Sequence, residues 1–477
     1  MTLRSVRTTI LAIVVVVVSL VPLAPTQADH PRFYSYDDLA KIVHEWERLG
    51  AEVDVPVVTE DDRDVYLVKV GNGPFTIMFS NVLHANEPSG SEAFIRFVWA
   101  LLGRQGPSFE KPTLPGVKPN APVFRALRNP KMRAELLSRV TIVGFPMMDP
   151  DGFENDHTRD FMANTDYSTK LTEQSAALEY ALDRYEPDLY IDSHGGPDSP
   201  DLNIGLVEPL ATEGAVIHES RRAAAIAWRA ATARDISLAY FEEHFFEIVL
   251  GQHGEPFASA DEIYWNSVSK LLPLTQESYQ LEGLPAVYTE TVGLQSVDPS
   301  ISISEGASAQ EVTMAGLAFE YSGLVSGERP EKLVAPAADG PLRVRLASPA
   351  RRFFATVRWK SALQDYDLRL LDAAGEVVAE STAPASDPYS YAARSRAIFV
   401  ERLSAGTYEL VATPTAEGLD DEAIVRTNWR VADRGRSRLQ GILDEHAEVR
   451  LCLEGQTAYG SATSSTPQTE RLGSPKC

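Results

Sequence analysis

Four short apolar segments that each run directly into a polar cluster constrain the fold of this chain most. Short apolar runs are typical of buried strands, and segments of helical periodicity separate these runs along the chain. Such alternation predicts a mainly parallel sheet, in which the carboxyl ends of the strands meet at one edge. We therefore expect the polar residues at that edge. The segments are Phe75–Phe79 before His84-Ala85-Asn86-Glu87, Val140–Met148 before Asp149-Pro150-Asp151-Gly152, Leu189–Ile191 before Asp192-Ser193-His194-Gly195-Gly196, and Ala286–Thr289 before Glu290.

The pattern along the chain predicts the α/β class: a mixed, mainly parallel sheet flanked by helices over 29–328, plus a C-terminal β-sandwich over 338–432. The first domain is expected to contain strands Val65–Val70, Phe75–Phe79, Val140–Phe145, Leu189–Ile191, Ile204–Val207 and Ala286–Thr289, and helices Tyr36–Leu49, Phe94–Leu102, Leu178–Tyr185, Glu213–Ala230 and Gln310–Leu324. The sandwich is expected to contain strands Leu342–Leu346, Phe354–Trp359, Tyr366–Leu371, Ala397–Phe399 and Tyr408–Ala412.

The N-terminal segment 1–28 has the features of a secretion signal. Arg4 and Arg7 precede the apolar run Ile10–Leu20, and small residues lead to Ala28, after which we expect cleavage. The apolar run is short for a membrane span, and no second candidate span follows it. We therefore expect a secreted protein with no stable membrane span after cleavage, and an uncleaved membrane anchor is the alternative.

Charge and cysteine content narrow the class of protein further. The formal net charge is −23, and an acidic surface repels nucleic acid, so we expect no nucleic-acid partner. The two cysteines, Cys452 and Cys477, lie in a C-terminal tail over 433–477 that we expect to be flexible. They can pair in an exported protein, but they cannot form a zinc-finger site, which needs four closely grouped ligands.

The polar clusters contain the parts of a hydrolytic zinc site. His84 and Glu87 stand three residues apart, and a helical turn there would let both side chains reach one point. Together with His194 they offer two imidazoles and one carboxylate, a set that holds zinc and leaves a position open for water. Glu290 ends an apolar segment, where a free carboxylate is costly, and is the candidate general base. Each motif alone is common, and their joint placement at strand ends carries the prediction.

In order and spacing, the four clusters resemble those of the carboxypeptidase A-like zinc metallocarboxypeptidases, over most of the first domain. The resemblance implies that His84, Glu87 and His194 bind one Zn²⁺ ion and that Glu290 activates the attacking water. It also implies an arginine, after the Asp-Pro-Asp-Gly stretch, that polarises the scissile carbonyl and stabilises the oxyanion. Arg159 is the candidate for that role.

The chain departs from this family at the residues that hold the terminal carboxylate of the substrate. The family has an Asn-Arg pair there, whereas one alignment of this chain gives Asn164 and Thr165. The other alignment keeps Asp166 and gives Ser168-Thr169, so the arginine is absent in both. Threonine cannot form a bidentate clamp on a carboxylate, which puts strict C-terminal exopeptidase action in question.

Two further roles are predicted around the site. The family has a substrate-binding tyrosine before the base, and both Tyr279 and Tyr264 lie in the corresponding stretch. Asp192 lies two residues before His194, and in an extended segment the two side chains share a face. Asp192 is therefore a candidate for orienting a ligand histidine, and capping of a nearby turn is its alternative role.

The sequence thus predicts a secreted zinc-dependent metallocarboxypeptidase that hydrolyses peptide bonds through metal-activated water and a glutamate base. A zinc amidase or deacylase on the same scaffold is one alternative, because it needs no grip on a terminal carboxylate. A non-catalytic zinc-containing binding protein is the other. For the β-sandwich, a cell-wall or carbohydrate contact is the role considered.

Overall fold

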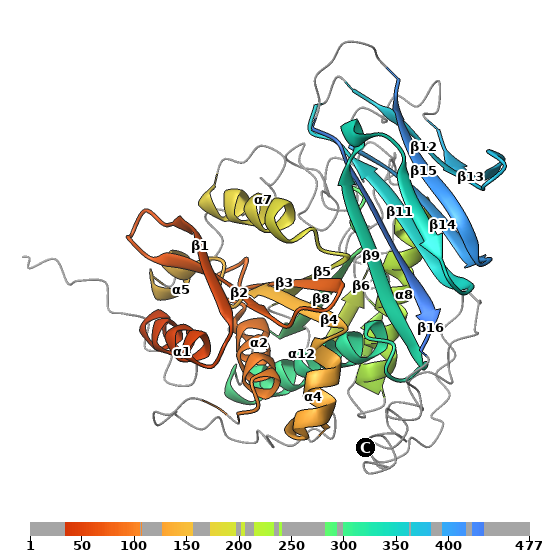
Figure 1. Cartoon of the computed structure of the whole chain (residues 1–477). Helices are drawn as coiled ribbons and strands as arrows, with labels where there is room; N and C mark the ends of the chain where they lie inside the picture. Colours follow the sequence, from red (N-terminus) through yellow and green to blue (C-terminus); the bar gives the residue numbers. More distant parts are fainter. Residues whose placement is uncertain are drawn as a thin grey trace, which may run out of the picture.

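The computed structural model describes residues 34–104, 106, 126–155, 172–196, 202–205, 214–232, 238–240, 282–292, 299–361, 364–382, 394–415 and 422–433. The chain forms an eight-stranded sheet and two four-stranded sheets. Helices flank the larger sheet, and the two smaller sheets lie beside it (Figure 1). No helix within these ranges is long and apolar enough to cross a membrane. The predicted secretion signal over 1–28, both cysteines and residues 434–477 lie outside the described residues.

The eight-stranded sheet has the order β1-β2-β4-β3-β5-β8-β6-β7. Its central strands β4, β3, β5 and β8 run parallel, whereas β1, β2 and β6 join through antiparallel pairs. The predicted α/β class with a mixed sheet is confirmed. The strands are β1 (Glu52–Val58), β2 (Asp64–Val70), β3 (Phe75–Asn81), β4 (Val140–Phe145), β5 (Leu189–Gly196), β6 (Leu202–Gly205), β7 (Leu238–Tyr240) and β8 (Ala286–Val292).

Helices cover both faces of this sheet, so its central strands are apolar on both sides. In β3, Ile77 and Phe79 pack on one face, and Met78 packs on the other. This two-sided burial explains the near-continuous apolar runs in the sequence. The first face carries α1 (Tyr36–Arg48), α2 (Pro88–Leu101), α4 (Pro130–Leu137), α8 (Gly214–Thr232) and α12 (Pro299–Tyr321), the second carries α7 (Glu173–Tyr185), and the short α5 (Pro150–Asn155) follows β4.

The strands β9 to β16, between residues 328 and 432, form two four-stranded antiparallel sheets, which we call the two-sheet unit. Their orders are β10-β15-β12-β13 and β14-β11-β16-β9, and apolar residues of both sheets share one hydrophobic cluster. The five predicted strands of this region coincide with or overlap observed strands, whereas β9, β13 and β16 were not predicted. The strands are β9 (Glu328–Pro336), β10 (Leu342–Leu346), β11 (Ala350–Arg358), β12 (Tyr366–Leu371), β13 (Val377–Ser381), β14 (Ser395–Leu403), β15 (Gly406–Pro414) and β16 (Ile424–Ala432).

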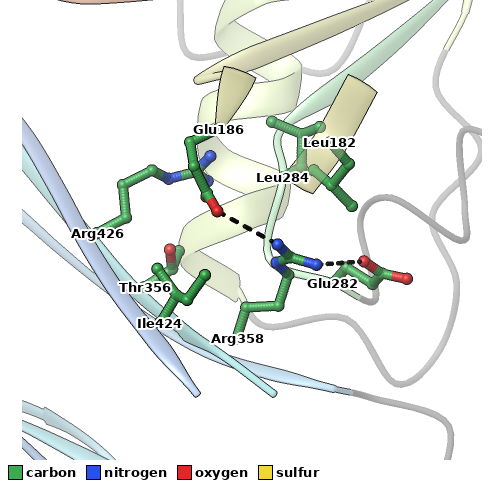
Figure 2. Close-up of a pocket in the computed structure, with 8 residues that line it drawn as sticks. All are labelled: Leu182, Glu186, Glu282, Leu284, Thr356, Arg358, Ile424 and Arg426. Carbon is green, nitrogen blue, oxygen red and sulfur yellow. Dashed lines mark hydrogen bonds and ion pairs between the residues drawn. The ribbon is translucent and has the colours of Figure 1, made fainter. Parts of the chain in front are cut away.

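The two-sheet unit contacts the eight-stranded sheet at the amino ends of β5 and β8. Arg426 of β16 donates hydrogen bonds to the carbonyl oxygens of Pro187 and Gly283, which stand just before these strands. Beside it, Arg358 of β11 lies between Glu186 and Glu282 (Figure 2). A cavity of about 10 Å³ remains among these side chains, which is room for about one water molecule. This contact combines charged and apolar side chains, and it lies at the end of the strands opposite to the carboxyl edge of the sheet.

Candidate metal centre

The turn after β3 brings His84 and Glu87 to the carboxyl edge of the sheet. Val82 has a φ of 56°, a left-handed conformation that is costly for a β-branched residue, and its side chain is fully buried. This left-handed residue stands directly after the last residue of β3. A backbone hydrogen bond of 3.1 Å from the Glu87 N–H to the His84 carbonyl then closes the turn. Glu87 directly precedes α2, whose first residue is Pro88, a residue type that suits the first position of a helix.

His194 reaches the same point from the neighbouring strand. The sequence predicted that His194 comes just after a strand that ends at Ile191. In the structure β5 continues to Gly196, so His194 lies inside the strand. Because β3 and β5 are adjacent and parallel, their carboxyl ends lie side by side. His84, Glu87 and His194 each offer one ligand atom, and these atoms lie within 4.8 Å of one another. The structure thus brings together the three residues proposed as metal ligands.

The spacing of the donor atoms suits a small divalent ion. The Nδ1 atoms of His84 and His194 are 3.4 Å apart, and the Glu87 oxygens lie 2.8 Å and 3.1 Å from them, respectively. Donor atoms bound to zinc at about 2.0–2.1 Å in a tetrahedral arrangement lie about 3.3 Å apart. Two nitrogens and a carboxylate are also donors that zinc accepts readily. The residues present therefore fit a zinc ion.

Burial and neighbouring charges have opposite effects on the ionisation of Glu87 and His194. Burial by itself favours the neutral form of Glu87, but interactions with His84 and His194 lower the pKa of its carboxyl to about 2. Burial likewise opposes the charged form of His194, but Asp192 and Glu87 raise its pKa well above the usual value. A bound metal needs the imidazole lone pairs, so its binding competes with protons and is expected to weaken as the pH falls.

A second layer of residues surrounds His194. Its Nε2 lies 3.0 Å from Asp192 Oδ2, on the face where the sequence placed both residues. The Tyr288 ring stacks on the imidazole with 4.6 Å between ring centroids, and Gln310 Nε2 donates to the His194 carbonyl at 3.1 Å. These contacts come from β5, β8 and α12. Asp192 and Tyr288 contact the imidazole itself, and Gln310 holds the backbone that carries it.

The Asp-Pro-Asp-Gly cluster lies against the turn that carries His84. The N–H of Asp149 donates to the Val82 carbonyl at 3.0 Å, which fixes the strained residue. Gly152 accepts no side chain, because a Cβ there would lie 2.9 Å from the Ala85 Cβ and closer still to Asp149. This cluster therefore supports the turn that carries His84 and Glu87. Arg159 follows it in the sequence.

The remaining predicted residues are placed only in part. In the parallel pair β5–β8, residue 290 is the register partner of His194, so the Glu290 backbone stands beside a ligand candidate. The side chain of Glu290 lies outside the described part of the structure. Arg159, Asn164, Thr165 and Tyr279 lie outside the described residues altogether.

Sequence reasoning missed several residues near His194. Ser80, Tyr190 and Tyr288 stand in apolar strands and read there as ordinary core positions. The signal that could have found Tyr190 is alternation, since residues 190, 192 and 194 of one strand share a face. For Ser80 and Tyr288 the sequence carries no such signal, because their place depends on strand order and register.

Metallo-carboxypeptidases are among the solved structures that are similar to this chain. The enzyme from Burkholderia cenocepacia is 16% identical, with a TM-score of 0.41, and the match covers 61% of this chain and 70% of that chain. The enzyme from Pseudomonas aeruginosa is 15% identical, with a TM-score of 0.42, over 60% and 68%. Bovine thrombin-activatable fibrinolysis inhibitor is 14% identical, with a TM-score of 0.37, over 61% and 98%.

These proteins belong to the class that the sequence motifs resemble. No family model matches the chain, and no curated protein matches its sequence. With TM-scores below 0.5, the likeness does not extend to activity, so the chemistry rests on the residues of the site alone.

Proposed function

We propose that this chain is a secreted, zinc-dependent hydrolase of the metallocarboxypeptidase type, which cleaves peptide bonds. The observation that supports the proposal is the convergence of His84 Nδ1, His194 Nδ1 and the Glu87 carboxylate within 4.8 Å at the carboxyl edge of a mixed sheet. Ligand sites of open α/β sheets lie at this edge. Burying these polar groups together costs free energy, and a bound metal ion would offset that cost.

His84, Glu87 and His194 are the proposed ligands of one zinc ion. When bound there, zinc supplies Lewis-acid polarisation of the substrate carbonyl and lowers the pKa of a water molecule. With three protein ligands, a coordination position stays open for water or substrate. Asp192 supports this set by holding the His194 ring from its far side.

Glu290 is the proposed general base. The register places its backbone beside that of His194, which brings it to the right strand end. A carboxylate there can accept the proton of the attacking water and later pass it to the leaving amine. Arg159 is proposed to stabilise the oxyanion, and Asn164, Thr165 and Tyr279 are proposed to contact substrate.

The proposed catalytic domain extends over 29–328, after a secretion signal over 1–28. The two antiparallel sheets with their shared core are proposed to form a β-sandwich accessory domain. A cell-wall or carbohydrate contact through this domain is not supported by the comparisons and stays a prediction. Detection of the protein in the culture medium of the producing cell tests its export.

Metal analysis and one pair of variants test the catalytic proposal. Purified protein is expected to contain close to one zinc ion per chain and to lose its peptidase activity with a chelator. Glu290→Gln is expected to keep the zinc and to lower kcat by at least about 100-fold, because a general base contributes about that much. Glu47→Gln, at an exposed position of α1, is the matched control. A protein without zinc, or unchanged turnover in Glu290→Gln, contradicts the proposal.

A zinc amidase or deacylase is the second candidate. It is favoured by one observation, the absence of an arginine at the Asn164-Thr165 stretch, where the resembling family grips the terminal carboxylate. Peptides with free and with amidated C-termini, assayed side by side, separate the two functions. Cleavage of both at equal rates excludes an exopeptidase, whereas strong preference for the free carboxylate excludes the second candidate. Zinc without hydrolysis of either would leave only a binding protein.

A further inference from the structure

Behind His194 lies a row of buried polar side chains that the proposed chemistry does not use directly. Ser80 of β3 and Tyr190 and Asp192 of β5 are all fully buried. Ser80 Oγ lies 2.6 Å from the Tyr190 hydroxyl and 2.7 Å from Asp192 Oδ1. Asp192 Oδ2 in turn lies 3.0 Å from His194 Nε2. Hydrogen bonds therefore connect Tyr190 through Ser80 to Asp192, and a close contact leads from Asp192 to His194.

Strand geometry accounts for this row. Ser80 and Asp192 are register partners in the parallel pair β3–β5, so they point to the same face of the sheet. Tyr190 and His194 lie two residues before and after Asp192, which puts them on that face as well. The face is the one covered by α7, where the neighbours of Tyr190 are apolar. Buried polar atoms in such surroundings must satisfy one another.

Proton counting fixes the direction of the hydrogen bonds. An ionised carboxylate only accepts, and a serine hydroxyl has one proton to donate. Ser80 donates that proton to Asp192, so the Tyr190 hydroxyl must donate to Ser80. The second Asp192 oxygen is left for His194. The Nε2 atom of His194 has no other hydrogen-bond partner among the described residues, although its contact with Oδ2 is close rather than well aligned.

We propose that Ser80 and Tyr190 are positioning residues for the metal site, which act on His194 through Asp192. The Asp192 carboxylate, held from behind by Ser80, keeps the proton of His194 on Nε2. The lone pair of Nδ1 then faces His84 and Glu87, as a metal ligand requires. Tyr190 sets the orientation of the Ser80 hydroxyl by donating to it. This inference rests on the proposed zinc site and adds the residues that prepare it.

A purely structural role makes a different prediction from a positioning role. If these hydroxyls served only to satisfy buried atoms, their removal would lower stability and leave metal affinity unchanged. If they orient His194, their removal lowers metal affinity, and the loss depends on Asp192. The second behaviour cannot arise from packing alone.

The experiment measures zinc affinity of the metal-free full-length protein by competition with a chromogenic chelator. Ser80→Ala is expected to bind zinc about 10-fold more weakly than wild type, and Asp192→Asn about 10- to 100-fold more weakly. Tyr190→Phe, which removes one oxygen atom only, is expected to lose a few-fold. Cobalt absorption spectra of the same variants are expected to shift, because the orientation of a ligand changes.

Two controls make the result decisive. Ser322→Ala removes a buried hydroxyl that donates to the Phe319 carbonyl at 2.6 Å, at the far end of α12, and is expected to leave zinc affinity unchanged. Ser80→Ala added to Asp192→Asn is expected to have no further effect on affinity, because Ser80 acts through Asp192. Circular dichroism tests whether each variant is folded. If Ser80→Ala does not fold, Tyr190→Phe takes its place in the test.

The outcomes separate this inference from the proposal it rests on. Wild-type zinc affinity in both Ser80→Ala and Tyr190→Phe overturns the positioning role while the zinc site stands. Additive losses in the double variant also overturn it. A wild-type protein that binds no zinc overturns the proposed function itself.

Discussion

Lys332 of β9 and Asp188, the residue before β5, form a buried ion pair 3.0 Å long between the two-sheet unit and the eight-stranded sheet. Asp188 also accepts a hydrogen bond of 2.8 Å from the Thr76 N–H and one of 3.1 Å from Asn428 of β16. Lys332 further donates to the carbonyl oxygen of Glu186. One carboxylate thus joins the starts of β3 and β5 to β9 and β16, two adjacent strands of the neighbouring sheet.

Removal of the Lys332 charge is expected to destabilise the whole chain. Lys332→Met keeps the length of the side chain but leaves Asp188 buried without its cation, which costs roughly 3–5 kcal/mol in the free energy of unfolding. Urea denaturation measures this. Lys360→Met is the control, because the Lys360 side chain is 49% exposed and its pair with Asp183 should contribute about 1 kcal/mol or less. Equal losses in the two variants would contradict the role of the buried pair.

The contact between the two parts should also weaken in acid. Asp183 of α7 accepts hydrogen bonds from Arg358 at 2.9 Å and Lys360 at 3.1 Å. Burial raises the pKa of Asp183, but these two cations outweigh burial and lower it below the usual value. The folded chain therefore binds this proton less tightly than the unfolded chain, whose aspartates titrate near about pH 3.9. The stabilisation is present above that pH and is lost as the pH falls through the lower, folded value.

Asp183→Asn tests this sign. On metal-free protein, wild type is expected to be more stable than the variant at about pH 6, and the difference should shrink steadily below about pH 4. Denaturant unfolding at several pH values measures it. A difference that grows toward acid would contradict the assigned direction.

Metal removal is expected to lower thermal stability without unfolding the sheet. Zinc that binds only the folded chain adds about 4 kcal/mol when its concentration is 1,000 times the dissociation constant. The melting temperature should therefore rise with added zinc in wild type. In His194→Ala the zinc dependence should vanish, and differential scanning calorimetry compares the two proteins. A melting temperature that responds equally to zinc in both would mean that the ion binds elsewhere.

Gly90 in α2 is expected to tolerate no side chain. A Cβ at this position would lie 2.9 Å from both Asn81 Oδ1 and the Ser193 Cβ, so α2 would have to move away from β3 and β5. Gly90→Ala should cost about 1–3 kcal/mol by overpacking, despite the higher helix propensity of alanine. It should also weaken zinc binding, because Glu87 directly precedes this helix.

The control for Gly90 is Gly214→Ala in α8, where the added Cβ would meet nothing within 4 Å. This variant is expected to be neutral or slightly stabilising, with unchanged zinc affinity. Thermal unfolding and chelator competition on both variants provide the comparison. If Gly90→Ala behaves like Gly214→Ala, the close approach of α2 does not constrain the site.

The central strands could be predicted because burial on both faces leaves a strong mark. The predicted Val140–Phe145 matches β4, and Phe75–Phe79 lies within β3. β1 was missed because all of its residues are exposed or only half-buried at a sheet edge, and because Pro56 lies within it. β9 was missed for the same reason, since Leu333 and Val334 on this edge strand are exposed. Edge strands lack the continuous apolar run on which the prediction depends.

The candidate site could be predicted in its ligands but not in its surroundings. His84, Glu87 and His194 follow apolar runs in the sequence, and the carboxyl ends of such strands meet wherever the strands are neighbours. The contact of Ser80 with Asp192 needs the register of β3 on β5, which no local pattern in the sequence specifies. The same holds for Tyr288, which stacks on His194 only because β8 is the next strand in the sheet.

The anchoring of β5 and β8 from their amino ends has a consequence for how such a protein can diversify. Arg426, Lys332 and Asn428 hold these strands at the end opposite to the metal-ligand candidates. Segments at the opposite end can then change in length and composition without loosening the scaffold. New substrate preferences would therefore be accessible to this chain at little cost in foldability.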